Sequence, residues 1–252
     1  HVHGGGDSDF MDEDASAFPT IAKAHCAHGT TALCSTTMTC ADSLLEKTID
    51  LFLEADKEPE NGAELLGLHL EGPYFSAASK GAQPIGEQRI PEREDLERIL
   101  RRAKGSILRW DAAPELPNME LFAKVMAENG VLTSLAHSAA TAPEALRAFD
   151  WGFSHVTHFY NACTTFHKKN GLVYSGIVEA TYLRDDVTIE LIGDGRHIPA
   201  HQGRGLHRSD HGRHAGGRCK LRKIRAGRQN HRRTRGHPGR RGAAARPQLL
   251  RG

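Results

Sequence analysis

Four histidines and one glutamate stand out by their positions in the chain. His1 and His3 lie two apart in "HVHGGG", so on an extended strand both imidazoles project from the same face. Glu71 ends the apolar run "LGLHLEGP", and a buried carboxylate without a partner costs too much free energy to be core filler. His137 and His158 end two later apolar runs. Imidazoles and a carboxylate are ligands for zinc or ferrous iron, so we predict a metal site.

Each of these signals is weak when it is taken alone. A short His-x-His occurs by chance or as the remnant of a tag, and a single histidine at a strand end is usually satisfied by hydrogen bonds. The joint pattern favours the metal site. His69 and His155 lie inside their runs, so we expect them to pack or to hydrogen-bond around the ligands rather than to bind the metal.

The elements that must position these residues follow an alternating pattern. Up to about residue 198, short runs rich in β-branched residues alternate with longer amphipathic stretches, which is typical of β/α units around a parallel sheet. We predict strands over 29–36, 64–72, 106–115, 130–138, 153–162 and 187–195. We predict helices over 15–28, 42–56, 91–104, 118–128 and 142–149, the second capped by Asp42.

Polar residues end almost every predicted strand. They are Glu71, Asp111, Glu115, His137, His158, Asp194 and His197. In a (β/α)8 barrel the chemistry lies at the carboxyl ends of the strands, so this placement favours a closed barrel. An open doubly wound sheet is the alternative, although it brings fewer strand ends to one site.

Charge divides the chain into two parts. About half of the 33 Lys and Arg residues follow Ala200, and the only acid there is Asp210. We therefore assign 1–198 to the barrel and 199–252 to a basic tail, which its composition predicts to be disordered. A nucleic-acid-binding arm is the rival interpretation of this tail, but the tail lacks interleaved aromatic residues and any recognised module.

Cysteine usage and hydropathy indicate the compartment. Five cysteines without a C-x-x-C pair fit a reducing environment. No apolar run approaches the roughly 18 residues of a membrane span. The chain begins at His1 without a charged n-region and an apolar h-region, so we interpret this start as a truncation rather than a signal peptide. We expect a soluble, cytoplasmic protein with no membrane partner.

The order of several motifs matches a known family. "HVHGGG", "LGLHLEGPYF", "KGAQ", "LAHSAAT", "VTHFYNACTTFHKK" and "IGDGRHI" resemble the N-acetylglucosamine-6-phosphate deacetylases of the amidohydrolase superfamily, over nearly all of 1–198. The resemblance implies a metal-dependent (β/α)8 TIM-type barrel that hydrolyses the acetamide of an amino-sugar phosphate and assembles as a homodimer. A dihydroorotase-like or aminoacylase-like amidohydrolase is the alternative.

The resemblance also assigns roles to single residues. Glu71, His137 and His158 match the main metal ligands, and His1 with His3 matches the pair that completes a second metal position. The metal would be zinc or iron, as one or two ions that polarise the acetamide carbonyl and activate water.

Four further positions match substrate contacts of the family. Asn161 and Ala162 match the "NA" that holds the sugar phosphate, and His197 matches the substrate-contacting histidine of "DGxH". Gln83 stands where some members have histidine in a "KGAH" loop, which weakens the case for a substrate contact there.

One expected catalytic residue is missing from the translated sequence. The family has an aspartate general base in a "TDAM"-like segment that ends the eighth strand. Read one nucleotide later, "DHGRHAGGR" can encode "ITDAMRAAG" and "AARPQLLRG" can encode "LPDRSSFAG". We infer a frameshift near 199–201, so that no catalytic aspartate, last strand or small β domain is encoded in frame and the barrel is incomplete.

Overall fold

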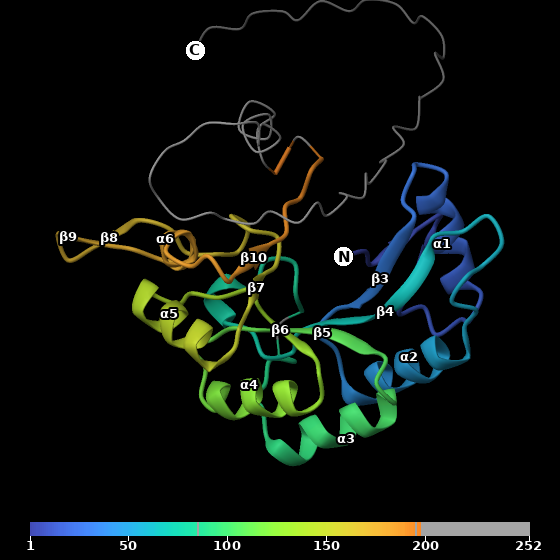
Figure 1. The fold of residues 1–252 in the computed structure, drawn as a ribbon, viewed down its shortest axis with the longest axis horizontal. Coiled ribbons are helices and arrows are strands. Elements are labelled where there is room, and N and C mark those ends of the chain that lie inside the picture. Colours follow the sequence, from blue (N-terminus) through green and yellow to red (C-terminus); the bar gives the residue numbers. More distant parts are fainter. Residues whose placement is uncertain (85, 195, 198–252) are drawn as a thin grey trace, which may run out of the picture.

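The computed structural model describes residues 1–84, 86–194 and 196–197, and a six-stranded parallel sheet forms its centre (Figure 1). The strands are β3 (Ala32–Thr37), β4 (Glu64–Glu71), β5 (Ile107–Ala112), β6 (Leu132–Leu135), β7 (His155–Val156) and β10 (Thr188–Ile189). Their spatial order, β10-β7-β6-β5-β4-β3, follows the chain without a reversal. A doubly wound sheet requires such a reversal, so this alternative is wrong.

Helices cover the outer side of the curled sheet, as Figure 1 shows for α2 to α5. The helices are α1 (Ala17–Cys26), α2 (Asp42–Glu54), α3 (Arg93–Ala103), α4 (Met119–Glu128), α5 (Ala142–Trp151) and α6 (Ile177–Tyr182). None of the helices in the described ranges is long and apolar enough to cross a membrane.

The first and last strands of the sheet approach each other. Val2 forms a parallel bridge with Ser35 on β3, which adds a seventh strand position before β3. His1 Nδ1 lies 2.7 Å from a carboxylate oxygen of Glu190, directly after β10. The described residues contain no eighth strand between these two edges. The fold is therefore an incomplete (β/α)8 barrel, as the motifs predicted, and the predicted tail 199–252 lies outside the described residues.

Several predicted elements differ in extent from those observed. The predicted strands 153–162 and 187–195 shrink to the two-residue strands β7 and β10, because the chain turns soon after each of them. Sequence patterns missed α6, the turn η1 (Ala77–Ser79) and two hairpins. The hairpins pair β1 (Gly4–Gly5) with β2 (Ser8–Asp9) and β8 (His167–Lys169) with β9 (Leu172–Tyr174).

The predicted cap of α2 is wrong. Ala41 is the N-cap residue, and Asp42 is the first residue of the helix without a side-chain capping bond. The Asp42 carboxylate instead accepts hydrogen bonds from Arg89 and Arg98. These cations compete successfully with the backbone amides for the carboxylate, because charged hydrogen bonds are the stronger ones.

An aromatic cluster joins the sheet to α4. Phe122 of α4 is fully buried, with its ring centroid 5.6 Å from Tyr74, 5.8 Å from Trp110 and 6.0 Å from Phe153. The indole of Trp110, on β5, donates a 2.8 Å hydrogen bond to the carbonyl oxygen of Gly72. This contact ties the centre of the core to the turn that follows Glu71.

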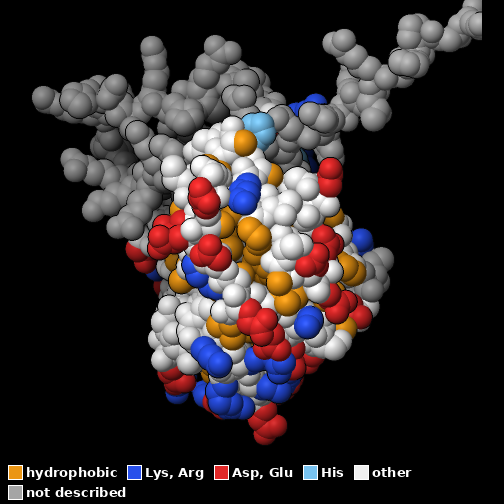
Figure 2. Space-filling view, turned by 90° about the vertical axis from the view of Figure 1, so that its right-hand side faces the viewer, with side chains coloured by type: hydrophobic (Ala, Val, Ile, Leu, Met, Phe, Trp, Pro, Cys, Tyr) orange, Lys and Arg blue, Asp and Glu red, His pale blue; other side chains and the backbone are white. Residues whose placement is uncertain are grey.

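Charged side chains connect neighbouring helices on the outside. Asp42, Glu46 and Asp50, on successive turns of α2, pair with Arg98 and Arg102 of α3. Figure 2 shows basic side chains gathered at the lower end of its face, toward α2 and α3 in Figure 1.

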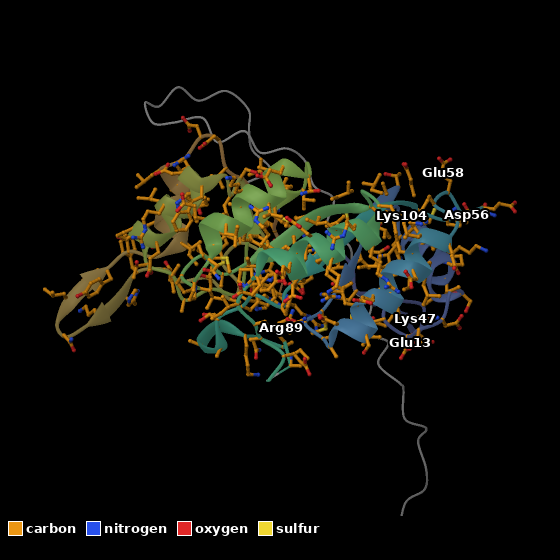
Figure 3. The ribbon with its side chains drawn as sticks, turned by 90° about the horizontal axis from the view of Figure 1, so that it is seen from below. Glu13, Lys47, Asp56, Glu58, Arg89 and Lys104 are labelled. Atoms are coloured by element: carbon orange, nitrogen blue, oxygen red, sulfur yellow. The ribbon has the colours of Figure 1, made fainter. Side chains whose placement is uncertain are left out.

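Figure 3 shows that charged residues continue beyond α2. Lys47 lies on α2, and Asp56 and Glu58 lie past its end, far from the β8–β9 hairpin. These charges are solvated surface groups, which contribute little stability one by one.

The aromatic cluster makes a stability prediction. Phe122→Ala should lower the free energy of unfolding by about 3–5 kcal/mol, because it removes buried surface and leaves a cavity. Phe166→Ala, which truncates a side chain that is 64% exposed, is the matched control and should cost less than about 0.5 kcal/mol. Urea unfolding of the two variants measures the difference, and equal losses would contradict the assignment of Phe122 to the core.

Candidate metal centre

Glu71 lies at the carboxyl end of β4 and is 3% exposed. The next residue, Gly72, has a φ of +102°, and a Cβ there would lie 2.1 Å from the hydroxyl of Thr39. Only glycine fits this position without a shift of its neighbours. The "EGP" segment therefore holds the carboxylate at the carboxyl end of β4, at the mouth of the incomplete barrel.

Four imidazoles surround this carboxylate. Oε1 of Glu71 lies 3.1 Å from His158 Nε2, 3.2 Å from His137 Nε2 and 3.7 Å from His1 Nε2. Oε2 lies 3.2 Å from His3 Nε2. The five predicted ligands thus form two groups that share Glu71, one with His137 and His158 and one with His1 and His3.

The outer nitrogen of each ring, Nδ1, lies beside an oxygen that can accept its proton. Nδ1 of His137 lies 3.1 Å from the carbonyl oxygen of Ser79, and Nδ1 of His158 lies 3.0 Å from that of Asn161. Nδ1 of His3 lies 3.3 Å from the carbonyl oxygen of Thr36, and Nδ1 of His1 faces the carboxylate of Glu190. These oxygens can only accept, so each ring can hold a proton on Nδ1, and a neutral ring in that tautomer presents the Nε2 lone pair to a cation. The oxygens of Glu71 also only accept, so in the absence of a cation the contacts with Glu71 are hydrogen bonds that need a proton on Nε2.

The inner nitrogens fit a bound cation. Nε2 of His137 and Nε2 of His158 lie 3.1 Å apart, and those of His1 and His3 lie 3.3 Å apart. Two nitrogens held by one tetrahedral zinc, at about 2.0–2.1 Å each, are separated by about 3.3 Å. Lone pairs that converge in this way repel one another unless a cation or a proton lies between them.

Backbone conformation helps to aim two of the rings. His137 has a φ of +45° and His158 a φ of +34°, in the left-handed region that few residues other than glycine adopt. Both residues lie just past the ends of their strands. The local strain turns the chain at the point where the imidazole must point inward, a feature typical of functional sites.

The carboxylate and the imidazoles stabilise each other's charged forms. Burial by itself raises the pKa of Glu71, but hydrogen bonds with His137, His158 and His3 outweigh it and lower that pKa well below its usual range. Burial lowers the pKa values of His3 and His158, yet their contacts with Glu71 prevail and raise both. Glu71 is therefore an anion that attracts positive charge to this position.

A buried charged network lies beside the ligands, inside the barrel. The guanidinium of Arg109 donates to Glu190 Oε2 at 2.8 Å, to His69 Nδ1 at 2.8 Å and to His155 Nε2 at 3.1 Å. His69 Nε2 lies 2.8 Å from Asp111 Oδ2. His69 and His155 thus lie outside the two candidate ligand groups and hydrogen-bond to Arg109 beside them.

This network fixes the charges of its members. Burial, reinforced by the positive charge of Arg109, lowers the pKa values of His69 and His155 to about 4. Burial raises the pKa of Glu190, but Arg109 outweighs it and lowers that pKa to about 2. At neutral pH the imidazoles are neutral and Glu190 is an anion.

Three of the predicted substrate residues lie near the ligands. Gln83 is buried, donates to Glu71 Oε2 at 2.9 Å and accepts from the backbone nitrogen of Thr39 at 2.8 Å, so the protein engages both of its polar atoms. Asn161 supplies the carbonyl that fixes His158, and the carbonyl of Ala162 accepts from the backbone nitrogen of Ser138.

Other predicted polar residues lie at the periphery of the cluster. His197 is exposed and its Nδ1 lies 2.8 Å from Asp194 Oδ2. No hydrogen bond or ion pair within the described ranges links His197 to Glu71. Glu115 accepts from the hydroxyl of Ser138 and the backbone nitrogen of Ala139, each at 2.6 Å, and so supports the loop that follows His137.

Sequence patterns missed Arg109 and Glu190. Both lie in or beside apolar strands, "ILRWDA" and "TIELIG", and the cost of burying an unpaired charge was the signal that each needs a partner. The pattern could not say which strand supplies that partner. The two residues meet because β10 and β5 face each other across the curled sheet.

The buried imidazoles predict a loss of stability in acid. Above about pH 6.5 both folded and unfolded chains hold a neutral His155, and below about pH 4 both hold it protonated. Between these values only the unfolded chain binds the proton, so stability should fall by on the order of 3 kcal/mol for this residue as the pH is lowered from 6.5 to 4. His155→Gln should flatten the curve of unfolding free energy against pH, measured with a chelator present; an unchanged slope would contradict the prediction.

Known proteins resemble most of the chain. N-acetylglucosamine-6-phosphate deacetylase of Lysinibacillus sphaericus is 32% identical over 210 residues, which are 81% of this chain and 51% of the relative. N-acetylgalactosamine-6-phosphate deacetylase of Escherichia coli O157:H7 is 30% identical, over 79% of this chain and 52% of the relative. The chain thus spans about half the length of the curated relatives it matches. No family model matches it.

Solved structures agree with these relatives. N-acetyl-D-glucosamine-6-phosphate deacetylase of Mycobacterium smegmatis matches with a TM-score of 0.73 and 26% identity, over 82% of this chain and 52% of that one. The Thermotoga maritima N-acetylglucosamine-6-phosphate deacetylase matches with a TM-score of 0.65 and 30% identity, over 79% of this chain and 51% of that one. Over most of its length the chain is therefore similar to N-acetylglucosamine-6-phosphate deacetylases, of which it matches about half.

Proposed function

We propose that this barrel binds one or two divalent cations, zinc or iron, and serves the hydrolysis of N-acetylglucosamine 6-phosphate to glucosamine 6-phosphate and acetate. The observation that carries the proposal is the convergence of four Nε2 atoms, in two groups, on the buried carboxylate of Glu71. The relatives support the substrate, since their names specify N-acetylglucosamine 6-phosphate or N-acetylgalactosamine 6-phosphate. One solved relative was studied in complex with N-acetyl-D-glucosamine-6-phosphate.

The chain's own residues would prepare the site for this reaction. Glu71, His137 and His158 would hold one cation, and His1 with His3 would hold a second beside the shared carboxylate. Such a cation polarises an acetamide carbonyl and lowers the pKa of water toward 7. Asn161 and Ala162 would orient the sugar phosphate, and His197 would contact the substrate. Gln83 donates to Glu71 and accepts from the backbone nitrogen of Thr39, so we assign it to the support of Glu71 rather than to a substrate contact.

This chain lacks a residue that the resemblance would assign to proton transfer. The resemblance places the general base in a "TDAM"-like segment, which the translated sequence lacks. We therefore expect the 252-residue chain to bind cations and to turn over little substrate. The frameshift, the homodimer and the cytoplasmic location stay predictions, as does the absence of a nucleic-acid partner.

The metal site has a direct test. Glu71→Gln removes the shared anion and should weaken cation binding by more than about 100-fold, because the loss of a ligand exceeds the 10- to 100-fold effect of removing a supporting group. Metal content after dialysis against buffered zinc or ferrous iron measures it. Glu179→Gln, whose carboxylate accepts from the backbone nitrogen of Gly176 at the start of α6, is the control and should bind as the parent chain does. An unchanged metal content in Glu71→Gln would overturn the site.

The reaction is tested on two chains, the present one and one whose codons after about Pro199 are read in the alternate frame. We expect acetate release from N-acetylglucosamine 6-phosphate to require the alternate frame and a bound cation. N-acetylgalactosamine 6-phosphate, dihydroorotate and an N-acetylated amino acid complete the panel. Turnover of either of the last two in preference to both sugar phosphates would favour the other amidohydrolase classes.

A further inference from the structure

Glu190 is a buried carboxylate that the proposed function leaves without a role. It is 6% exposed and follows directly after β10. Its backbone is fixed on both sides, because its nitrogen donates to the carbonyl of Val156 at 3.0 Å and its carbonyl accepts from the nitrogen of Phe159 at 2.7 Å. The side chain therefore starts from a rigid position beside His158.

The two oxygens of this carboxylate accept hydrogen bonds from different side chains. Oε2 accepts from Arg109 at 2.8 Å, and Oε1 accepts from His1 Nδ1 at 2.7 Å. Oε1 also accepts, at a longer 3.4 Å, from the backbone nitrogen of His158. Arg109 in turn is held by His69 and His155, so it cannot follow the carboxylate if the carboxylate moves. Glu190 is clamped between a fixed cation and the first imidazole of the site.

The contact with Glu190 distinguishes His1 from the other three rings. His3, His137 and His158 each present Nδ1 to a backbone carbonyl, which is part of the fold itself. Only His1 depends on a side chain for this bond. An acceptor at Nδ1 keeps the proton there, directs Nε2 toward Glu71 and His3, and raises the basicity of that nitrogen.

We propose that Glu190 is a positioning residue that fixes the tautomer and direction of His1 for cation binding by the group of His1, His3 and Glu71. The assignment rests on the proposed metal function. It makes the two ligand groups unequal, since the rings of His137 and His158 each present Nδ1 to a backbone carbonyl and Glu190 contacts only the backbone nitrogen of His158, at 3.4 Å. Glu190, directly after β10, thereby supports His1, which lies beside β3 at the opposite edge of the sheet.

The experiment measures cobalt(II) binding to the full 252-residue chain by visible absorption, together with metal content. The parent chain should bind two cations. Glu190→Gln should weaken the second cation by about 10- to 100-fold and leave the first unchanged. Glu179→Gln, a carboxylate-to-amide change away from both groups, is the matched control and should leave both affinities unchanged.

A double-mutant cycle separates positioning from a general structural effect. In a His1→Ala chain, which lacks the ring on which Glu190 acts, Glu190→Gln should cause no further loss of cobalt affinity. A loss of equal size in both backgrounds, or unchanged affinity in Glu190→Gln alone, overturns the assignment. If Glu190→Gln fails to fold because Arg109 is left unpaired, the double variant Arg109→Gln/Glu190→Gln is measured with and without His1→Ala and decides by the same criterion.

The proposed function and this assignment fail in different ways. A parent chain that binds no cobalt overturns the metal function, and the role of Glu190 with it. A parent chain that binds only one cation, with Glu190→Gln equal to it, leaves the metal function standing and overturns the role of Glu190.

Discussion

A single buried anion sets the requirements for everything around it. The Glu71 carboxylate has left water, and such a group is stable only if positive charge or several donors replace its hydration. The chain meets this need with groups from the ends of different strands, because no one strand can surround a carboxylate. A parallel sheet that curls enough to bring its first and last strands together is the architecture that makes this convergence available.

Inside the barrel, next to the Glu71 cluster, a second group of charges also needs partners of opposite sign. Arg109 is a largely buried cation, with its side chain 14% exposed, and Glu190 and Asp111 supply the compensating charge. Such networks contribute less to stability than an apolar core of the same volume often would, since desolvation offsets much of the attraction. The contribution of this network is to fix the orientation of its side chains. The network holds the strands at fixed separations and presents defined hydrogen-bond acceptors to the rings above it.

The sequence predicted much of this site because its signals are local. A carboxylate at the end of an apolar run followed by Gly-Pro, and histidines at the ends of later runs, needed only the geometry of parallel strands to be brought together. Helix and strand positions from 29 to 151 followed from hydrophobic periodicity in the same way. Glu190 was harder to interpret, because its role depends on which distant strand end lies opposite it.

Other differences have more specific causes. Asn170 and Gly171, both with positive φ, form the turn of the β8–β9 hairpin, and this Asn-Gly signal was present in the sequence but was passed over. Asp42 has the residue type of a cap, and its true role depended on two arginines that are distant in sequence. Local chemistry therefore indicated the candidate ligands, which the structure brings together, but not the groups that contact them.

The left-handed backbone at His137 and His158 restricts which ligands this site could ever use. Cysteine and glutamate are common metal ligands, but only asparagine, aspartate and histidine are enriched among non-glycine residues in this conformation. At these two positions, replacing histidine by cysteine or glutamate would therefore cost conformational free energy, in addition to any change in metal preference. The main-chain conformation at His137 and His158 thus limits which side chains, and through them which metals, a variant of this site could use.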